Sequence, residues 1–140
     1  MPHVKIIIIL RNPTERAYSH YWHEVRGGFE KLSFAEAIEK EAERLAGEEE
    51  KIKKEKNYYS FAHNHYSYLA RGVYVKQIKR WREFFLSQQM LILNYSDLRL
   101  KPQAVLDKVF VFLGLKPRPI KPIQPPAPSY PPLEPELNGS

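Results

Sequence analysis

Residues 5–10 contain the feature that most restricts the fold, a run of four isoleucines from Ile6 to Ile9. β-branched side chains favour strands, and a run that is apolar at every position is typical of a strand covered on both faces, as in a parallel sheet. Directly after it, Asn12 and Pro13 are an N-cap and a first helical residue. The sequence therefore predicts a buried strand followed at once by a helix that runs to about Val25.

The rest of the ordered part continues this alternation. Capping residues, apolar spacing and glycines predict a helix from Ser33 to Gly47, one long helix or two over residues 59–85 with a break near Gly72, a second strand over Met90–Leu93, and a helix from Pro102 to Gly114. Strand, helices, strand and helix in this order indicate an α/β fold with a small parallel sheet flanked by helices.

Proline is distributed very unevenly along the chain. Nine of the twelve prolines lie between Pro117 and Pro135, and so dense a stretch cannot hold a helix or a central strand. We therefore expect one folded domain over residues 1–115 and an extended, Pro-rich tail over residues 116–140.

Charge and cysteine content limit the classes of partner and compartment. With 22 Lys and Arg, 16 Asp and Glu and a net charge of +6, the chain favours anionic partners, among them phosphate, sulfate, nucleic acid and acidic polysaccharide. The absence of cysteine excludes disulfides, thiolate metal sites and a cysteine nucleophile, and we expect a cytoplasmic protein. No apolar run approaches the roughly 20 residues of a membrane span, so we expect no membrane partner.

The first strand and helix carry the candidate site. Arg11 follows the strand, at the edge where open α/β sheets bind ligands. Ser19 lies on the helix, three residues after Arg16 and four after Glu15. A guanidinium fork, a hydroxyl and the positive end of a helix together suit a dianionic phosphate. The alternative is that Arg11 pairs with a carboxylate and Ser19 is a surface residue of the helix.

Histidines are grouped in two places, around His20 and His23 and at His63 and His65. Residues two apart on a helix point in different directions, and no carboxylate has the spacing that a metal site needs. We therefore expect no metal ion in this chain.

The pattern Arg11-Asn12-Pro13, Arg16 and Ser19 resembles the 3'-phosphate-binding motif of sulfotransferases that use 3'-phosphoadenosine 5'-phosphosulfate (PAPS). The likeness is greatest to the bacterial and heparan-sulfate-type carbohydrate branch, whose domain has a P-loop-NTPase-like three-layer fold. It covers roughly residues 4–115 and includes the segments RAYSHYWHEVRGG, LSFAEAI, RGVYVKQIKRW and VFVFLGL.

The resemblance implies roles for four residues. Arg11 and Ser19 match the residues that bind the 3'-phosphate of PAPS and of its product, adenosine 3',5'-bisphosphate. His23 matches a histidine that faces the acceptor, a carbohydrate hydroxyl or amine. Tyr130 matches a tyrosine of a loop that closes over the nucleotide.

The resemblance also implies parts that this sequence lacks. None of the six glycines belongs to a Lys-containing Gly-Thr-Thr loop for the 5'-phosphosulfate or to a Walker motif, and the family's usual catalytic base lies near that loop. We therefore expect the C-terminal portion of a sulfotransferase domain, with an exposed strand edge that leads to self-association or marginal folding.

Two further function classes stay open. In the first, the chain is a non-catalytic domain that binds adenosine 3',5'-bisphosphate or sulfated glycans. In the second, it is a basic nucleic-acid-binding domain, a reading that rests on net charge alone and has no groove-reading motif, so we expect no nucleic-acid partner.

Overall fold

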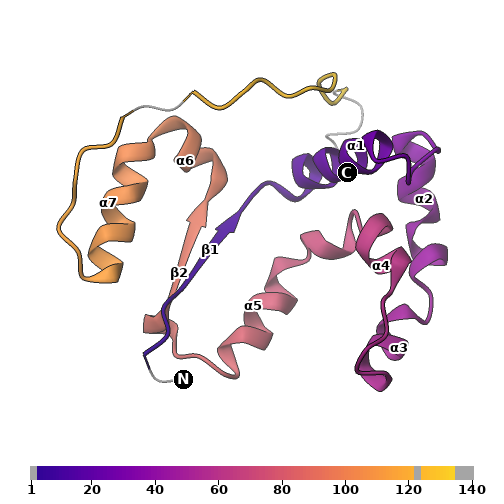
Figure 1. Cartoon of the computed structure of the whole chain (residues 1–140), viewed down its shortest axis with the longest axis horizontal. Coiled ribbons are helices and arrows are strands. Elements are labelled where there is room, and N and C mark those ends of the chain that lie inside the picture. Colours follow the sequence, from indigo (N-terminus) through magenta and orange to yellow (C-terminus); the bar gives the residue numbers. More distant parts are fainter. Residues whose placement is uncertain (1–2, 122–123, 135–140) are drawn as a thin grey trace. The chain divides into compact units, whose positions relative to one another are not determined.

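The computed structural model describes residues 3–121 and 124–134, which form two compact units. Of these described residues, the first unit contains those up to Asn12 and those between Tyr74 and Ser129, and the second contains Pro13–Val73 together with residues 130–134. Figure 1 shows the elements that each unit contains.

The first unit is built on a parallel pair of strands. β1 (Ile6–Leu10) and β2 (Met90–Asn94) pair in register from Ile6 opposite Met90 to Leu10 opposite Asn94. The short 3-10 helix η2 (Ser87–Gln89) precedes β2, and α6 (Tyr95–Leu100) and α7 (Pro102–Leu113) follow it and contact it. The predicted parallel sheet is confirmed, as is the last helix, which Gly114 closes in the left-handed conformation at φ 74°.

We expected neighbouring elements to cover β1 on both faces, and this prediction was wrong. The side chains alternate, and those of Ile7 and Ile9 are 38% and 51% exposed. The reason is the position of α7, which packs beside β2, as Figure 1 shows. The isoleucine run therefore has one open apolar face.

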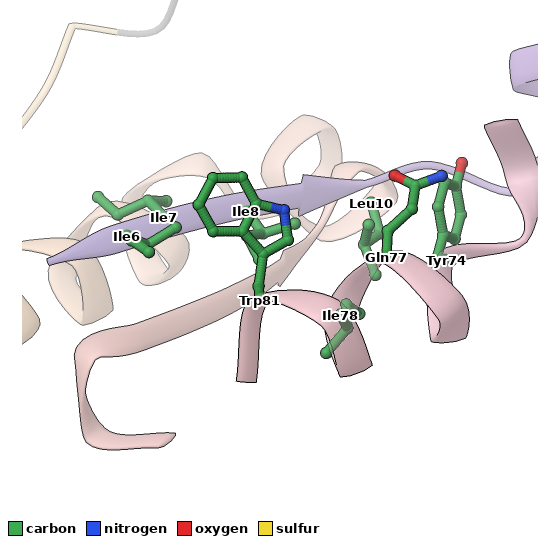
Figure 2. A pocket seen from close by; sticks show the side chains of 8 residues that line it. All are labelled: Ile6, Ile7, Ile8, Leu10, Tyr74, Gln77, Ile78 and Trp81. Atoms are coloured by element: carbon green, nitrogen blue, oxygen red, sulfur yellow. The ribbon is translucent and has the colours of Figure 1, made fainter. Parts of the chain in front are cut away.

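Helix α5 (Tyr74–Arg82) lies along β1. Between them is an apolar groove of about 240 Å³. Figure 2 shows Trp81, Ile78, Gln77 and Tyr74 of α5 along β1 in this groove. Trp81 is still 48% exposed, so the groove is open to solvent.

The second unit is helical. It contains α1 (Pro13–Arg26), α2 (Phe34–Leu45), α3 (Glu48–Lys54), α4 (Phe61–Tyr66) and the 3-10 turn η1 (Ala70–Gly72). The predicted capping box at Ser33 and Glu36 is present, and the predicted break near Gly72 separates α4 from α5. The core is formed by Ala17 and Tyr21 of α1, Ala37 of α2, and Tyr68.

Polar side chains hold the segment between α4 and η1. The guanidinium of Arg16 donates to the carbonyls of Ser67 and Tyr68. The buried carboxylate of Glu41 accepts the backbone N–H groups of Leu69 at 2.7 Å and Ala70 at 2.8 Å. Buried backbone groups without partners are costly, and these bonds allow an irregular segment to lie against the core.

The described part of the tail has no helix or strand, as the prolines predict. Two separate helices were not expected. α3 lies in a charged stretch without apolar spacing, and α6 begins directly after β2, with the side chain of Asn94 as its N-cap. In the part of the chain that the structure describes, no helix has the length and apolar character needed to cross a bilayer.

Candidate functional site: the start and the exposed face of helix α1

Arg11 lies at the carboxyl end of the sheet, in the first unit. It follows β1 as Tyr95 follows β2, and its guanidinium carbon lies 5.0 Å from the centre of the Tyr95 ring. The hydroxyl of Tyr74 donates to the Arg11 carbonyl at 2.8 Å. Both contacts fix the arginine at the edge of the sheet where α/β folds bind ligands.

Ser19 and His23 lie on α1, in the second unit. A spacing of four residues places them on one side of the helix. The Ser19 side chain is half-buried, and His23 is exposed. A hydroxyl and an exposed imidazole are thus neighbours on the surface of α1.

Tyr130 packs on the same helix. Its ring is parallel to that of Trp22, with 6.3 Å between centres and 3° between planes, and it meets the Tyr18 ring edge-on at 5.6 Å. The sequence placed Tyr130 beside the site only by resemblance and did not identify Trp22. The spacing of two aromatic residues four apart on α1, Tyr18 and Trp22, is the signal that could have found this contact.

Another side of α1 is held by a buried carboxylate. Glu24 is 4% exposed, and its oxygens lie 3.2 Å from Nε2 of His20 and 2.6 Å from Nδ1 of His65. Burial lowers the pKa of His20. The Glu24 carboxylate raises this pKa in part, and the nearby cations Arg16 and Arg71 lower it further. These contacts attach α4 to α1.

A second buried carboxylate, Glu30, holds the turn after α1. It pairs with Arg44 at 2.5 Å and accepts hydrogen bonds from the Tyr68 hydroxyl and from the backbone N–H groups of Lys31 and Leu32. Burial would raise the pKa of Glu30, but these donors, Arg44 first, lower it to about 2. The same environment raises the pKa of Tyr68, through burial and the Glu30 carboxylate. Glu30 therefore joins the turn after α1 to α2 and to Tyr68.

The predicted residues thus fall into two groups. Ser19, His23 and Tyr130 lie in the second unit, where Tyr130 contacts the residues that flank Ser19 on α1. Arg11 lies in the first unit, two residues before the helix begins. Among the described residues, no group of three or more His, Cys, Asp or Glu is arranged to hold a metal ion.

A family model described as a sulfotransferase domain matches residues 1–124 of the chain. The chain belongs to this sulfotransferase family. The resemblance found in the sequence is thereby confirmed, and so is a transferase class for the family.

Two curated sulfotransferase relatives are animal proteins. The chain is 32% identical over 115 residues to the bifunctional heparan sulfate N-deacetylase/N-sulfotransferase 1 of Caenorhabditis elegans, a match of 82% of this chain and 12% of the relative. It is 35% identical over 121 residues to the human bifunctional heparan sulfate N-deacetylase/N-sulfotransferase 3, a match of 84% of this chain and 12% of the relative. The chain thus spans about an eighth of these proteins.

A solved structure extends the comparison to the fold. The sulfotransferase from Alicyclobacillus acidocaldarius superimposes with a TM-score of 0.63 and 33% identity, over 98% of this chain and 48% of that protein. The expected P-loop-NTPase-like sulfotransferase fold, with its small parallel sheet, is confirmed. The chain spans about half the length of this bacterial sulfotransferase.

Proposed function

We propose that this chain takes part in sulfuryl transfer from PAPS to a hydroxyl or amine of a carbohydrate acceptor, with Arg11 and Ser19 holding the 3'-phosphate of the nucleotide. The observation that supports this most directly is the position of Arg11, at the carboxyl end of a parallel strand and immediately before a helix that carries Ser19. That edge of an α/β sheet, together with a helix N-terminus, is a common place for phosphate.

The chemistry of the two side chains suits a dianion. A guanidinium offers a planar fork of N–H donors that matches two phosphate oxygens, and a serine hydroxyl adds one donor. Tyr74 and Tyr95 fix Arg11 at its backbone and its guanidinium, so that less conformational freedom is lost on binding. PAPS would supply the sulfuryl group, and adenosine 3',5'-bisphosphate would be the product.

His23 is the residue that we propose to meet the acceptor. It is exposed and lies one helical turn after Ser19. In the proposed reaction its imidazole hydrogen-bonds the acceptor or exchanges a proton with it, and positioning and charge neutralisation lower the barrier. We further propose that this reaction takes place in the cytoplasm.

The second candidate is a binding function without turnover, directed at adenosine 3',5'-bisphosphate or sulfated glycans. It is favoured by the glycines, none of which belongs to a phosphate loop with a neighbouring Lys-Ser or Lys-Thr. Incubation with PAPS and a carbohydrate acceptor separates the two candidates, because only the first yields sulfated product.

Calorimetric titration with adenosine 3',5'-bisphosphate tests the proposed site. We expect binding that is lost with adenosine 5'-monophosphate and weakened at least tenfold by Arg11→Ala and by Ser19→Ala. Arg82→Ala, which removes an exposed guanidinium from α5, is the matched control and should leave the affinity unchanged. Equal affinity for both nucleotides, or no binding by a chain shown to be folded by circular dichroism, would refute the proposed phosphate site.

A further inference from the structure

The hydroxyl of Tyr59 is the surface end of a chain of hydrogen bonds that leads into the second unit. Nε2 of His65 lies 3.2 Å from this hydroxyl, and Nδ1 of the same imidazole lies 2.6 Å from the Glu24 carboxylate. Glu24 is 4% exposed, whereas Tyr59 is 64% exposed. We call Tyr59, His65 and Glu24 the tyrosine relay. The proposed sulfuryl transfer uses none of these three residues.

The buried carboxylate determines which nitrogen of His65 carries the proton. An ionised carboxylate only accepts hydrogen bonds, so Nδ1 donates to Glu24. In a neutral imidazole the other nitrogen, Nε2, then accepts, and the Tyr59 hydroxyl donates to it. Hydroxyl, imidazole and carboxylate are thus connected in the same order as in serine hydrolases, with a phenol in place of the serine hydroxyl.

Two phenyl rings hold the His65 imidazole in this orientation. The imidazole packs against the rings of Phe29 and Phe61, with 4.2 Å and 4.3 Å between ring centres. The two phenyl rings also meet each other edge-on at 5.9 Å. The base is therefore fixed by packing as well as by its hydrogen bond to the carboxylate.

The backbone beside Tyr59 is fixed as well. Ser60 is 2% exposed and is the N-cap of α4, where its hydroxyl accepts the N–H of His63 at 3.0 Å. Because α4 also contains His65, one short local structure holds both the phenol and the imidazole. Groups that are already oriented lose little further freedom when they react.

A phenol next to a fixed base is a nucleophile. An isolated tyrosine phenol ionises near about pH 10 and is protonated at neutral pH. A positioned base that takes up the proton while the new bond forms accelerates such a step by roughly 10²- to 10⁴-fold.

The surroundings of the relay favour an uncharged aromatic reactant. Phe29 and Phe61 are 45% and 43% exposed and offer apolar ring surface beside His65. Aromatic groups pack favourably on such rings. The negative charge of Glu24, by contrast, disfavours an anionic reactant.

We propose that Tyr59 is a nucleophile that accepts acyl groups from uncharged aryl esters, with His65 as the general base. The Tyr59 oxygen bonds to the ester's carbonyl carbon, and the bond from that carbon to the aryl oxygen breaks. The phenol proton passes to Nε2 of His65 and from there to the departing aryl oxide. The products are an acylated Tyr59 and a free phenol, and the step is independent of the proposed nucleotide site.

The experiment uses p-nitrophenyl acetate as the ester. The full chain is incubated with it at pH 7, and tandem mass spectrometry of tryptic peptides measures the rate of acetylation at each tyrosine. We expect Tyr59 to react at least tenfold faster than N-acetyltyrosine amide, a fully exposed phenol without a neighbouring base. The other eight tyrosines, which are buried or half-buried, should react more slowly still.

Variants of His65 separate proton transfer from a structural role. His65→Asn keeps an amide donor for Glu24 and removes the base, and we expect it to slow Tyr59 acetylation at least tenfold. His65→Gln can accept the Tyr59 hydrogen bond through its amide oxygen but cannot take up the proton, so it should be equally slow. His63→Asn, at an exposed histidine of the same helix, is the matched control and should leave the rate unchanged.

The original chain alone already tests the nucleophile. Acetylation of Tyr59 no faster than that of N-acetyltyrosine amide overturns the proposal. An unchanged rate in His65→Asn, shown to be folded by circular dichroism, overturns the role of His65. Full reactivity in His65→Gln would assign the effect to the hydrogen bond and likewise overturn the general base. The assay contains no nucleotide, so failure of the proposed phosphate site leaves each of these outcomes decisive.

Discussion

The carboxylate of Glu24 lies 2.6 Å from Nδ1 of His65 and thereby joins α1 to α4. Its other oxygen lies 3.2 Å from Nε2 of His20, so that one buried acid is shared by two imidazoles. Glu24 is five residues after Ser19, and its carboxylate therefore points to a different side of α1. The polar cluster therefore sets the position of the helix without occupying the face proposed to bind the nucleotide.

Replacement of Glu24 by glutamine should destabilise the second unit. The amide keeps the shape but loses the charge, and at least one buried ring nitrogen is left poorly satisfied. We expect a loss of about 2–3 kcal/mol in the free energy of unfolding, measured by urea denaturation at pH 7. Glu49→Gln, at a side chain that is 80% exposed and pairs with Lys53, is the control and should cost under about 0.5 kcal/mol. Equal losses would show that the Glu24 cluster contributes nothing specific.

Stability should fall as the pH drops below about 6.5, the pKa of an unperturbed histidine, because the pKa of His20 is lowered in the folded chain. Burial is the main cause, Arg16 and Arg71 add to it, and Glu24 opposes it. Below pH 6.5 the unfolded state binds the proton more readily than the folded state, so protonation favours unfolding. Urea midpoints between pH 5 and 7.5 should show this slope, and His20→Gln should reduce it. An identical slope in His20→Gln would assign the effect to other groups.

Protonation of Glu30 should cause a second loss of stability, at more acidic pH. Its pKa is about 2 in the folded chain against an ordinary value of 4.5, so its contribution to stability is complete above pH 4.5 and is lost as the pH falls toward 2. Glu30→Gln should abolish this loss and should cost about 2–4 kcal/mol at pH 7, because Arg44 would lose its partner. Thermal unfolding between pH 2 and 7 measures both. A variant that is as stable as the original chain at pH 7 would contradict the role given to this pair.

Local patterns predicted those parts of the fold that local chemistry determines. The isoleucine run, the capping box at Ser33 and Glu36 and the left-handed Gly114 each lie where the sequence placed them. Each depends on residues within one turn or one strand. Sequence spacing therefore carries enough information to predict them.

Contacts between distant residues were not predictable in this way. Glu41 satisfies the N–H groups of Leu69 and Ala70, which are 28 and 29 residues away, and nothing in its helical pattern distinguishes it from an exposed glutamate. The exposure of Ile9 likewise depends on where α7 packs. In the candidate site, the roles proposed for Arg11 and Ser19 came from a motif, whereas the contact of Tyr130 with Trp22 required the structure.

Gly72 should not tolerate a side chain. A Cβ at this position would lie 3.0 Å from Cβ of Pro13 and 3.6 Å from its Cα, at the first residue of α1. Because the proline ring is rigid, the start of α1 must shift, and we expect Gly72→Ala to cost about 1 kcal/mol of stability and Gly72→Val more. Thermal unfolding of the two variants tests this. If valine costs no more than alanine, the close approach to Pro13 does not limit this position.

The open face of β1 should make the chain self-associate. Ile7 and Ile9 are 38% and 51% exposed and lie on a strand that pairs only with β2 among the described residues. An exposed apolar strand with a free edge readily pairs with another chain. We expect sedimentation equilibrium to show association that increases with protein concentration, and Ile9→Lys to weaken it, because a lysine on this face opposes burial.

Val111→Lys, which places the same charge at a 68% exposed side chain of α7, is the control and should leave association unchanged. A chain that stays monomeric over the accessible concentrations, or association that Ile9→Lys does not alter, would exclude the β1 face as the contact.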